Sequence, residues 1–581
     1  MLDLKQLKRL IKQEHSHLPQ VKVALLGDTA TQLLATAMRG AAIDMGLDLA
    51  LFEADYNQVE QQLLDPQSEL HGFMPQYMVL FQATHRLVDD HASMPPEQRA
   101  FLAKRRLEFV EGILNDKAWT GCRFICLNYP EIDDTVFGNY ANQVQSSLIY
   151  QTRLLNVGLM QLAERYDNLS IVDLAALQAQ QGRRVMFSPS VYASTEMVLS
   201  IDALPPVAYR IVQVIAAQRG TFKKCLILDL DNTLWGGIIG DDGLEGIQLG
   251  HGLGIGRVFT ELQQWCKKLQ QRGIILCVVS KNDEAIAKEP FQHHPDMVLR
   301  LEDIAVFIAN WETKVDNIRA IQQILNIGFD SMVFLDDNPF ERAIVREHIP
   351  GITVPELPED PAEYLEHLYG LNLFETASAS EADDKRTRQY QQEAQRVELK
   401  RTFGNEQEFL ASLDMQARVE PFNAFNTPRV AQLTQRSNQF NLRTMRYNED
   451  DVRRLAGDPQ VIDLAFSLSD RFGDHGLIAV VVMRPLDSAT LFVDTWLMSC
   501  RVLKRGMERF TLDQMVAQVQ GRGYRRIVGE YIPTPKNGMV AEHYPSLGFH
   551  ELQGTAHKQW VLELDEYEPQ ACHIHLSNPK Q

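Results

Sequence analysis

Short runs of consecutive apolar residues recur along the first two-thirds of this 581-residue chain, separated by stretches with helical spacing. The clearest runs are 21–27, 77–81, 123–127, 224–228, 274–279 and 331–335. A strand with one face in water alternates apolar and polar residues, whereas a strand of a parallel sheet covered by helices on both faces does not. The pattern therefore predicts α/β folding around parallel sheets.

Changes in this pattern divide the chain into four expected parts. Residues 1–219 read as one α/β domain, because Pro205-Pro206 and Gly220 interrupt the chain near its end. Residues 220–374 read as a second, Rossmann-like α/β domain, and the polar segment 375–402 as a connecting helix. Residues 403–581 form an α+β part with strands expected near 461–468, 477–483 and 490–497. We therefore expect a multidomain protein.

Charge and composition exclude several classes of protein. The chain has 57 Lys+Arg against 76 Asp+Glu, a formal net charge of −19. A general nucleic-acid binder or a polybasic membrane-surface protein needs the opposite surplus. The chain has no apolar stretch long enough to span a bilayer. Seven cysteines without a paired C-x-x-C motif fit a reducing compartment. We expect a cytoplasmic protein with no nucleic-acid and no membrane partner.

Polar side chains follow the apolar runs of the second part. Asp229 and Asp231 come directly after the run 224–228. The other polar positions end later runs or open a helix: Ser280, Lys281, Asn282, Lys314, Asp336, Asp337 and Asn338. Because open parallel sheets bind ligands at the carboxyl ends of their strands, we expect these side chains to converge. Carboxylates, a hydroxyl and an ammonium group are what a Mg²⁺ ion and a phosphoryl group need.

Two acids after a strand are also common as a turn or helix cap, so Asp229 and Asp231 alone would not indicate catalysis. The ordered set resembles the haloacid dehalogenase superfamily of phosphatases and phosphotransferases. The string from Leu228 to Gly243, LDLDNTLWGGIIGDDG, is similar to the FkbH-like branch (subfamily IIIC). That resemblance implies transfer of a glyceryl group from 1,3-bisphosphoglycerate to an acyl carrier protein for polyketide biosynthesis.

The resemblance also implies roles for single residues. Asp229 would be the nucleophile that forms an aspartyl-phosphate, and Asp231 the acid and base. Lys314 and Ser280 would bind the phosphoryl group. Mg²⁺ would be held by Asp229, the Asp231 carbonyl and Asp336, with Asp337 in support. The expected substrate-binding set is completed by Lys281, Asn282, Asn338 and Thr233, although Thr233 is better suited to bracing the loop.

The spacing of the motifs limits what can cover this site. Ser280 comes 51 positions after Asp229, and a predicted helix at 257–271 fills much of that interval. A large cap domain does not fit there. An open site of this kind favours a bulky substrate such as the phosphopantetheine arm of a carrier protein.

The first part resembles SGNH-type hydrolases, because Gly27-Asp28-Thr29 is similar to their Gly-Asp-Ser opening. Thr29 replaces the nucleophilic serine. No histidine occurs between His91 and His251, so the histidine that would serve as base near the end of such a domain is missing. We expect an inactive fold used for docking or packing, which FkbH-like proteins commonly carry.

The last part resembles GNAT acyltransferases. In the loop that would bind a pyrophosphate, Arg501 and Gly506 fit, but Lys504 occupies a glycine position. Cys500 is a candidate thiol for accepting the glyceryl group, because cationic neighbours lower a thiol pKa; a small buried residue is the alternative. Arg505 and His475 are further candidates for substrate binding, with a turn-stabilising role equally open for His475.

Two alternatives to glyceryl transfer stay open. One is a Mg²⁺-dependent phosphomonoesterase or phosphotransferase acting on another small or carrier-bound phosphate ester, and the other is a non-enzymatic scaffold for a carrier protein. An acidic carrier would be repelled by the net charge of this chain, so docking requires a local basic patch. The candidates are Arg501, Lys504, Arg505, Arg509, Arg522, Arg525 and Arg526.

Overall fold

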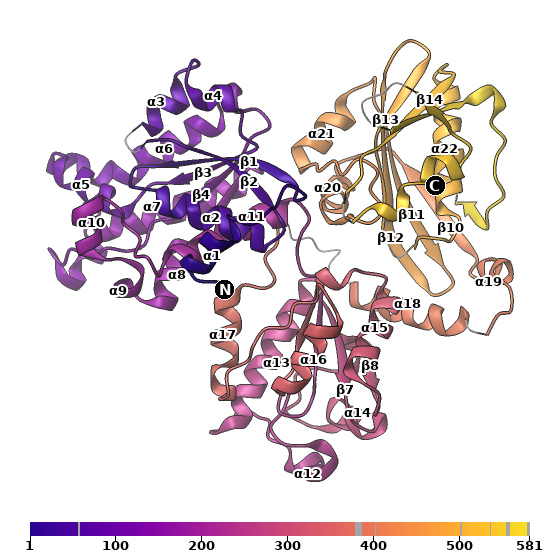
Figure 1. Cartoon of the computed structure of the whole chain (residues 1–581), viewed down its shortest axis with the longest axis horizontal. Coiled ribbons are helices and arrows are strands. Elements are labelled where there is room, and N and C mark those ends of the chain that lie inside the picture. The colour runs from indigo at the N-terminus through magenta and orange to yellow at the C-terminus, as the bar shows by residue number, and fades with distance from the viewer. Residues whose placement is uncertain are drawn as a thin grey trace. The chain divides into compact units, whose positions relative to one another are not determined.

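The computed structural model describes residues 1–55, 58–377, 386–400, 402–499, 502–534, 536–553 and 558–577. The chain divides into two compact units, Met1–Gln218 and Arg219–Gln581. Figure 1 labels the helices and strands of each. No helix in the described part of the chain combines the length and apolar character needed to cross a bilayer.

The first unit contains a five-stranded parallel sheet in the order β2-β1-β3-β4-β5. The strands are β1 (Gln20–Gly27), β2 (Asp48–Glu53), β3 (Tyr77–Phe81), β4 (Arg123–Leu127) and β5 (Leu169–Val172). The helices are α1 (Leu4–Leu10), α2 (Gln32–Asp44), α3 (Val59–Leu64), α4 (Glu69–Phe73), α5 (Thr84–Ser93), α6 (Leu102–Leu114), α7 (Leu148–Arg165), α8 (Leu174–Gln181), α9 (Arg183–Met186), α10 (Pro189–Thr195) and α11 (Leu204–Gln218). The runs 77–81 and 123–127 coincide with β3 and β4.

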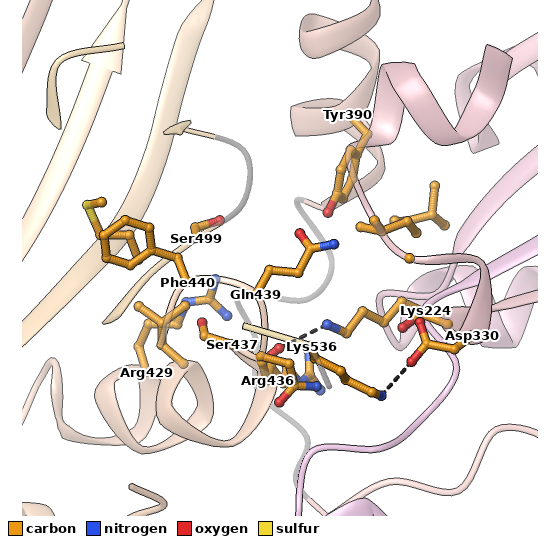
Figure 2. Close-up of a pocket in the computed structure, with 17 residues that line it drawn as sticks. Lys224, Asp330, Tyr390, Arg429, Arg436, Ser437, Gln439, Phe440, Ser499 and Lys536 are labelled. Carbon is orange, nitrogen blue, oxygen red and sulfur yellow. Dashed lines mark hydrogen bonds and ion pairs between the residues drawn. The ribbon is translucent and has the colours of Figure 1, made fainter. Parts of the chain in front are cut away.

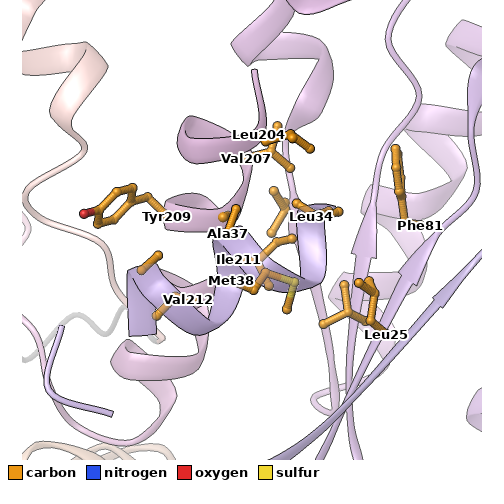
Figure 3. Close-up of a cluster of buried hydrophobic side chains, with 14 of the residues drawn as sticks. Leu25, Leu34, Ala37, Met38, Phe81, Leu204, Val207, Tyr209, Ile211 and Val212 are labelled. Atoms are coloured by element: carbon orange, nitrogen blue, oxygen red, sulfur yellow. The ribbon is translucent and has the colours of Figure 1, made fainter. Parts of the chain in front are cut away.

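One face of this sheet is covered by α2 and α11. Leu25 of β1, Met38 of α2 and Ile211 of α11 are fully buried in one apolar cluster (Figure 3). Each fully buried side chain of this size stabilises the fold by about 1.5–3 kcal/mol. A second cluster of buried side chains covers Ala24 and Leu26, the neighbours of Leu25 on β1. Burial on both faces explains why the residues from Val23 to Leu26 of this strand are all apolar.

The second unit begins with a four-stranded parallel sheet in the order β8-β7-β6-β9. Its strands are β6 (Cys225–Leu228), β7 (Ile275–Ser280), β8 (Ile304–Ala309) and β9 (Met332–Leu335). The helices are α12 (Ile239–Gly246), α13 (Ile255–Gln271), α14 (Glu284–His293), α15 (Lys314–Leu325), α16 (Pro339–His348) and α17 (Tyr364–Leu371). The sequence pattern predicted β6, β7 and β9 but not β8, which lies at the edge of the sheet.

The rest of the second unit is built on an eight-stranded mixed sheet in the order β15-β16-β14-β13-β12-β11-β10-β17. Its strands are β10 (Met415–Glu420), β11 (Ile462–Asp470), β12 (Gly473–Pro485), β13 (Thr490–Met498), β14 (Arg526–Tyr531), β15 (His550–Leu552), β16 (Lys558–Glu563) and β17 (Ile574–Leu576). The helices are α19 (Glu406–Ser412), α20 (Thr427–Arg436), α21 (Glu449–Gly457), α22 (Met507–Gly521) and α23 (His543–Ser546). The predicted multidomain fold, with parallel sheets followed by an α+β part, is confirmed.

Helix α18 (Arg386–Lys400) packs against both sheets of the second unit. On one side, the Gln391 amide donates to the carbonyls of Glu302 at 3.1 Å and Ile304 at 2.9 Å. On the other side, the Arg396 guanidinium makes two 2.7 Å bonds to the carboxylate of Asp470. These contacts fix the connecting helix to the parallel sheet and to the mixed sheet.

Candidate phosphoryl and metal site

The predicted polar residues meet at the carboxyl ends of β6, β7 and β9. Asp229 is the first residue after β6, which pairs with β7 on one side and β9 on the other. Asp336 and Asp337 follow β9, and Lys314 is the first residue of α15. Because the three strands are parallel and adjacent, residues far apart in the sequence reach one end of the sheet.

Lys314 joins two of the acids. Its Nζ atom is 2.9 Å from Oδ1 of Asp229 and 2.6 Å from Oδ2 of Asp336. All three side chains are nearly inaccessible to water, with exposed fractions of 5% for Asp229, 5% for Lys314 and 0% for Asp336. Asp337 completes a cluster in which one carboxylate oxygen from each acid lies within 4.8 Å of the others. An all-oxygen donor set with few carboxylates suits Mg²⁺.

The electrostatics of the cluster follow from its burial. Burial raises the pKa of Asp229 to about 7, and Asp336 adds to this rise, although Lys314 opposes it. Burial and Asp336 likewise raise the pKa of Asp337. Burial alone would lower the pKa of Lys314, but Asp229 and Asp336 together raise it, so the ammonium group stays charged. A bound divalent cation would favour the ionised carboxylates and so complete the charge balance.

Asp231 lies apart from the three-carboxylate cluster. Its Oδ1 atom accepts from Trp235 Nε1 at 2.9 Å and from the Ile239 amide at 3.0 Å. Its Oδ2 atom accepts from Asn282 Nδ2 at 2.8 Å. Both oxygens are therefore fixed, which holds the carboxyl group in one orientation on the loop that carries Asp229. The side chain does not enter the metal cluster, and the resemblance assigned only the Asp231 carbonyl to the metal.

Other predicted residues lie around the same strand ends. Ser280 is buried at the end of β7, and its hydroxyl accepts from Asn282 at 3.2 Å. Thr233 accepts from the Asp337 amide at 3.1 Å, which braces the loop. Lys281 forms an ion pair of 2.6 Å with Glu341.

Asn338 supports the loop after β9. Its amide donates to Asp336 Oδ1 at 2.9 Å, and its side chain caps α16 at the Phe340 amide, also at 2.9 Å. The side chain of Asn338 is thus engaged in local structure, and its part in substrate binding stays a prediction.

Sequence reasoning missed Arg342. Its guanidinium donates to the main-chain carbonyls of Asp336 at 2.8 Å and Asp337 at 2.7 Å, and pairs with Glu356 at 3.0 Å. This buried arginine holds the acidic loop after β9 in place. No motif indicates it, because the contact depends on how α16 packs beneath the loop.

Thr29 of the first unit stands where SGNH-type hydrolases have their nucleophilic serine. Its side chain is 1% exposed. Its hydroxyl donates to the main-chain carbonyl of Glu196. A nucleophilic hydroxyl must instead donate to a general base. The expectation that this part of the chain is an inactive fold stays a prediction.

The predicted acyl-transfer residues of the last part are described only in part. Cys500 and Arg501 lie outside the described residues. Lys504 has a φ of 62°, the left-handed region that favours glycine, at the position where the resemblance expects glycine. Its amide donates to the Glu508 carboxylate at 3.2 Å. A carboxylate thus occupies the start of α22, where a pyrophosphate would bind in a GNAT acyltransferase.

Arg505 and His475 belong to a buried ion-pair network. Arg505 is 7% exposed and pairs with Glu393 of α18 at 2.5 Å. His475 is 2% exposed and lies 3.0 Å from Asp470, which also binds Arg396. Burial is the largest cause lowering the pKa of His475. In this structure Arg505 therefore holds α18 to the mixed sheet and presents no charge on the surface.

The expected basic patch is not a single surface. Of its described members other than Arg505, Lys504 and Arg509 lie at the start of α22, whereas Arg522, Arg525 and Arg526 follow its end. A helix of 15 residues separates the two groups by about 22 Å. These arginines were grouped by sequence proximity, and the helix between them places them at opposite ends.

Comparisons with protein families and with solved structures relate this chain to known proteins. Residues 22–216 match the family described as FkbH, N-terminal domain. A solved structure from Bacteroides fragilis, an N-terminal part containing a phosphatase domain complexed with Mg, is 58% identical; the alignment covers 65% of this chain and 100% of that chain with a TM-score of 0.64. A comparison with curated proteins found no match.

Weaker likenesses concern the GNAT fold. The ribosomal-protein alanine N-acetyltransferase of Escherichia coli is 14% identical, with 25% of this chain and 90% of that chain covered and a TM-score of 0.20. The GNAT domain of S. lividans PAT is 15% identical, with 25% of this chain and 89% of that chain covered and a TM-score of 0.21.

The phosphatase-domain relative is matched over its full length, and the first unit matches the family's N-terminal domain. The resemblance inferred from the residues after β6 is confirmed: this chain belongs to the FkbH-like family of the haloacid dehalogenase superfamily.

Proposed function

We propose that this chain is a Mg²⁺-dependent phosphatase coupled to glyceryl transfer. It would take 1,3-bisphosphoglycerate as donor and leave a glyceryl thioester on the phosphopantetheine arm of an acyl carrier protein. The observation that carries the phosphatase part is the Lys314 ammonium group between Asp229 and Asp336, beside Asp337, at the carboxyl ends of adjacent strands. Family membership supports the transfer part.

Asp229 would act as the nucleophile of the phosphatase step. Its carboxylate oxygen forms a bond to the C3 phosphorus while the bond from phosphorus to the C3 oxygen breaks. Asp231 gives a proton to the departing C3 oxygen and later takes one from the water that hydrolyses the aspartyl-phosphate. Trp235, Ile239 and Asn282 orient Asp231 for both transfers.

The cations of the site would balance the charge of the phosphoryl group. Lys314 and the Ser280 hydroxyl would bind its oxygens, and the burial of both side chains supports this role because little water would screen each interaction. Mg²⁺, held by Asp229, Asp336 and Asp337, would supply further positive charge to the transferring group.

The transfer step would use a thiol. Its thiolate attacks C1 of the acyl phosphate, a carbon–sulfur bond forms, and the bond to the phosphate oxygen breaks with loss of inorganic phosphate. Cys500 or the carrier arm itself would provide the thiol. Helix α12, with eight residues, is the helix between the Asp229 loop and α13. The shortness of this insertion supports the access of a long phosphopantetheine arm to the phosphatase site.

Weighing the carrier protein tests the proposal. The full chain, Mg²⁺, 1,3-bisphosphoglycerate and a holo-carrier are mixed, and the mass of the carrier is measured. We expect a glyceryl adduct with the native chain and a phosphoglyceryl adduct with Asp229→Asn, because this change blocks only the phosphatase step. No adduct of either kind with any holo-carrier would overturn the transfer proposal.

One observation favours a simpler second candidate, a Mg²⁺-dependent phosphomonoesterase or phosphotransferase. The phosphoryl residues all come from the segment between β6 and α16, so the site needs no contribution from the mixed sheet. This candidate predicts turnover of small phosphate esters without a carrier and full activity in Cys500→Ser. The glyceryl-transfer proposal predicts instead that the native chain acts on the carrier-bound ester much faster than on the free one.

A further inference from the structure

The exposed apolar side chains around the four-stranded parallel sheet gather at one end of that sheet. Every residue from 220 to 374 is described, and six large apolar side chains in this range are exposed. Each of the four strands is followed by one of them, no later than the first turn of the next helix. These four residues are Ile238 after β6, Ile286 after β7, Trp311 after β8 and Phe340 after β9, and we call them the apolar rim.

The amino ends of the same strands have a different character. A cavity of about 450 Å³ lies there, lined largely by charged and polar side chains such as Lys224, Asp330 and Lys536 (Figure 2). None of the six exposed apolar side chains lies in a segment that leads into a strand, since the remaining two are Leu253, just before α13, and Tyr369, on α17. Single exposed apolar side chains are normal, but their collection at one end of a sheet marks a surface that meets a ligand or partner.

The two aromatic members of the rim stand next to the phosphoryl site. The residue before Trp311 donates its amide to the Ser280 carbonyl at 3.2 Å. The Phe340 amide donates to the Asn338 side chain at 2.9 Å, and the Asn338 amide donates to Asp336, also at 2.9 Å. Both aromatic residues nevertheless face water, with exposed fractions of 78% for Trp311 and 67% for Phe340. Their backbone is thus fixed beside the site while their rings extend into solvent.

The two isoleucines of the rim stand beside Asp231. Ile238 precedes Ile239, whose amide donates to Oδ1 of Asp231 at 3.0 Å. Ile286 lies in the first turn of α14, which begins shortly after Asn282, and the Asn282 side chain donates to Oδ2 of Asp231 at 2.8 Å. Helices α12 and α14 also contact each other. The rim therefore places apolar groups beside the expected acid and base as well as beside the phosphoryl-binding residues.

The charges in the same segments restrict what the rim can bind. The exposed acids of these segments are Asp241, Asp242, Asp283, Glu284 and Glu312. The exposed cation Lys281 is paired with Glu341 at 2.6 Å. A surface with this balance repels the face of an acidic protein, so the body of an acidic carrier does not suit it. An uncharged chain with apolar groups does.

We propose that the apolar rim binds the pantetheine portion of a substrate arm, so that the phosphatase site selects a phosphate ester on that arm over the same ester free in solution. Between its own phosphate and its thiol this portion is uncharged and extended, with a dimethyl group and two amides. It buries apolar area against the rim and keeps the acidic carrier at a distance. The inference rests on the proposed function, because transfer to the arm supplies this ester. The rim residues determine specificity and take no part in the chemistry.

Selection of the arm-bound ester has a consequence for the order of the two steps. A phosphate ester on the arm exists only after transfer has formed the thioester. The Asp229 site then acts on the product of transfer, and free 3-phosphoglycerate is a poor substrate. Transfer therefore precedes dephosphorylation.

Calorimetry on the full chain carrying Asp229→Asn, with Mg²⁺ present, tests the rim without turnover. The probes are 3-phosphoglycerate, S-(3-phosphoglyceryl)pantetheine and unphosphorylated S-glycerylpantetheine. We expect the phosphorylated thioester to bind about tenfold or more tightly than 3-phosphoglycerate, because its chain buries apolar area on the rim. It should also bind more tightly than the unphosphorylated thioester, because its phosphate occupies the phosphoryl site.

Variants of the two rings connect this preference to the rim. In the same background, Trp311→Ser and, separately, Phe340→Ser should each reduce the preference for the phosphorylated thioester over 3-phosphoglycerate about tenfold, because each removes an aromatic anchor. Trp311→Phe should retain most of it. Phe425→Ser is the matched control, an aromatic residue of the mixed-sheet part that is 96% exposed, and should leave the preference unchanged. The melting temperature of each variant confirms folding.

Three results would overturn the proposal: a phosphorylated thioester that binds no more tightly than 3-phosphoglycerate, one that binds no more tightly than its unphosphorylated form, or a preference that is equal in Trp311→Ser, Phe340→Ser and Phe425→Ser. None of them would decide the proposed function, which the mass of the carrier and phosphate release by the native chain test separately. Absence of a carrier adduct would in turn refute transfer by this chain, while calorimetry with the ready-made thioester still measures binding to the rim.

Discussion

Both parallel sheets of this protein place an aspartate directly after an interior strand, yet the two aspartates have different surroundings. Asp28 follows β1 and accepts from the Ala83 amide at 2.8 Å. Asp229 follows β6 and meets Lys314 at 2.9 Å, with Asp336 and Asp337 nearby. Burial raises the pKa of both, to about 6 for Asp28 and about 7 for Asp229.

The difference lies in what the neighbouring strand ends provide. In the second unit, β9 contributes two further acids and α15 contributes a lysine at its first residue. In the first unit, Thr29 is bonded to a main-chain carbonyl, and Arg86 donates to the Asp28 carbonyl at 3.0 Å. Among the described residues, Asp28 belongs to no cluster of three possible metal ligands. A strand-end aspartate is therefore common to both sheets, and only the added acids and cation make a phosphoryl site.

The largest expected effect is on phosphate release. Asp229→Asn should reduce it about 1,000-fold or more, because the nucleophile is lost. Asp28→Asn should change it less than about twofold, since Asp28 belongs to no such cluster of acids among the described residues. Release of inorganic phosphate at saturating Mg²⁺ measures both. Equal losses in the two variants would remove the distinction between the two sheets.

The second effect concerns the buried ion pairs of Lys314 with Asp229 and Asp336. Lys314→Met leaves Asp229 and Asp336 without their cation and should lower the free energy of unfolding by about 3–5 kcal/mol in the absence of Mg²⁺. Adding Asp336→Asn to Lys314→Met should recover part of this loss, because one of the uncompensated charges is gone. Chemical denaturation of the second unit gives the values. A double variant less stable than Lys314→Met would contradict this account of the charge balance.

The third effect is the pH dependence of the first unit. The folded pKa of Asp28, about 6, lies above its unfolded value of 3.8, so the folded state binds more protons between these two values. Stability should therefore fall as pH rises from about 4 to about 6, by up to about 3 kcal/mol at 1.4 kcal/mol per pKa unit. Asp28→Asn should flatten this slope. Hydrogen exchange in β1 and β3 across this pH range measures it, and an unchanged slope would assign the dependence to another group.

The smallest expected effect is stabilisation by metal. At a Mg²⁺ concentration 100 times Kd, the second unit should gain about 2.7 kcal/mol of stability, and the first unit nothing. Asp337→Asn should reduce the gain, because it removes one of the three carboxylates. Hydrogen exchange in β6 and β1, with and without Mg²⁺, compares the two sheets directly. Equal protection in both strands would contradict a metal site confined to the second unit.

The sequence predicted that these residues converge, for a local reason. Its residues stand at the ends of short apolar runs, and a parallel sheet brings the carboxyl ends of its strands together whatever the loops between them do. The positions of Asp229, Lys314 and Asp336 in the sequence are therefore enough to place them together. The sequence pattern did not predict the edge strand β8, and no motif indicated that Arg342 would bind the carbonyls of Asp336 and Asp337. Both features depend on packing around the sheet.

The same reasoning could not predict the partners of the charged residues in the last part of the chain. Arg505 was expected in a basic docking patch, but it is buried against Glu393, and the other described arginines of that patch lie at opposite ends of α22. Neither a residue's charge nor its place in the sequence says which acid it will meet. That depends on α18, which carries Glu393 and packs between the two sheets of the second unit.

The sequence by itself determined the class of fold, the strands that the acids follow and the family, because apolar runs and the motifs that follow them are short-range signals. The tertiary structure decided which cations face which anions. Lys224, Arg429, Arg436 and Lys536 are spread over more than 300 positions, and they line one cavity only because α20 and the segment after β14 contact the amino-end side of the parallel strands. Such convergence is a property of packing between distant segments, and no local pattern encodes it.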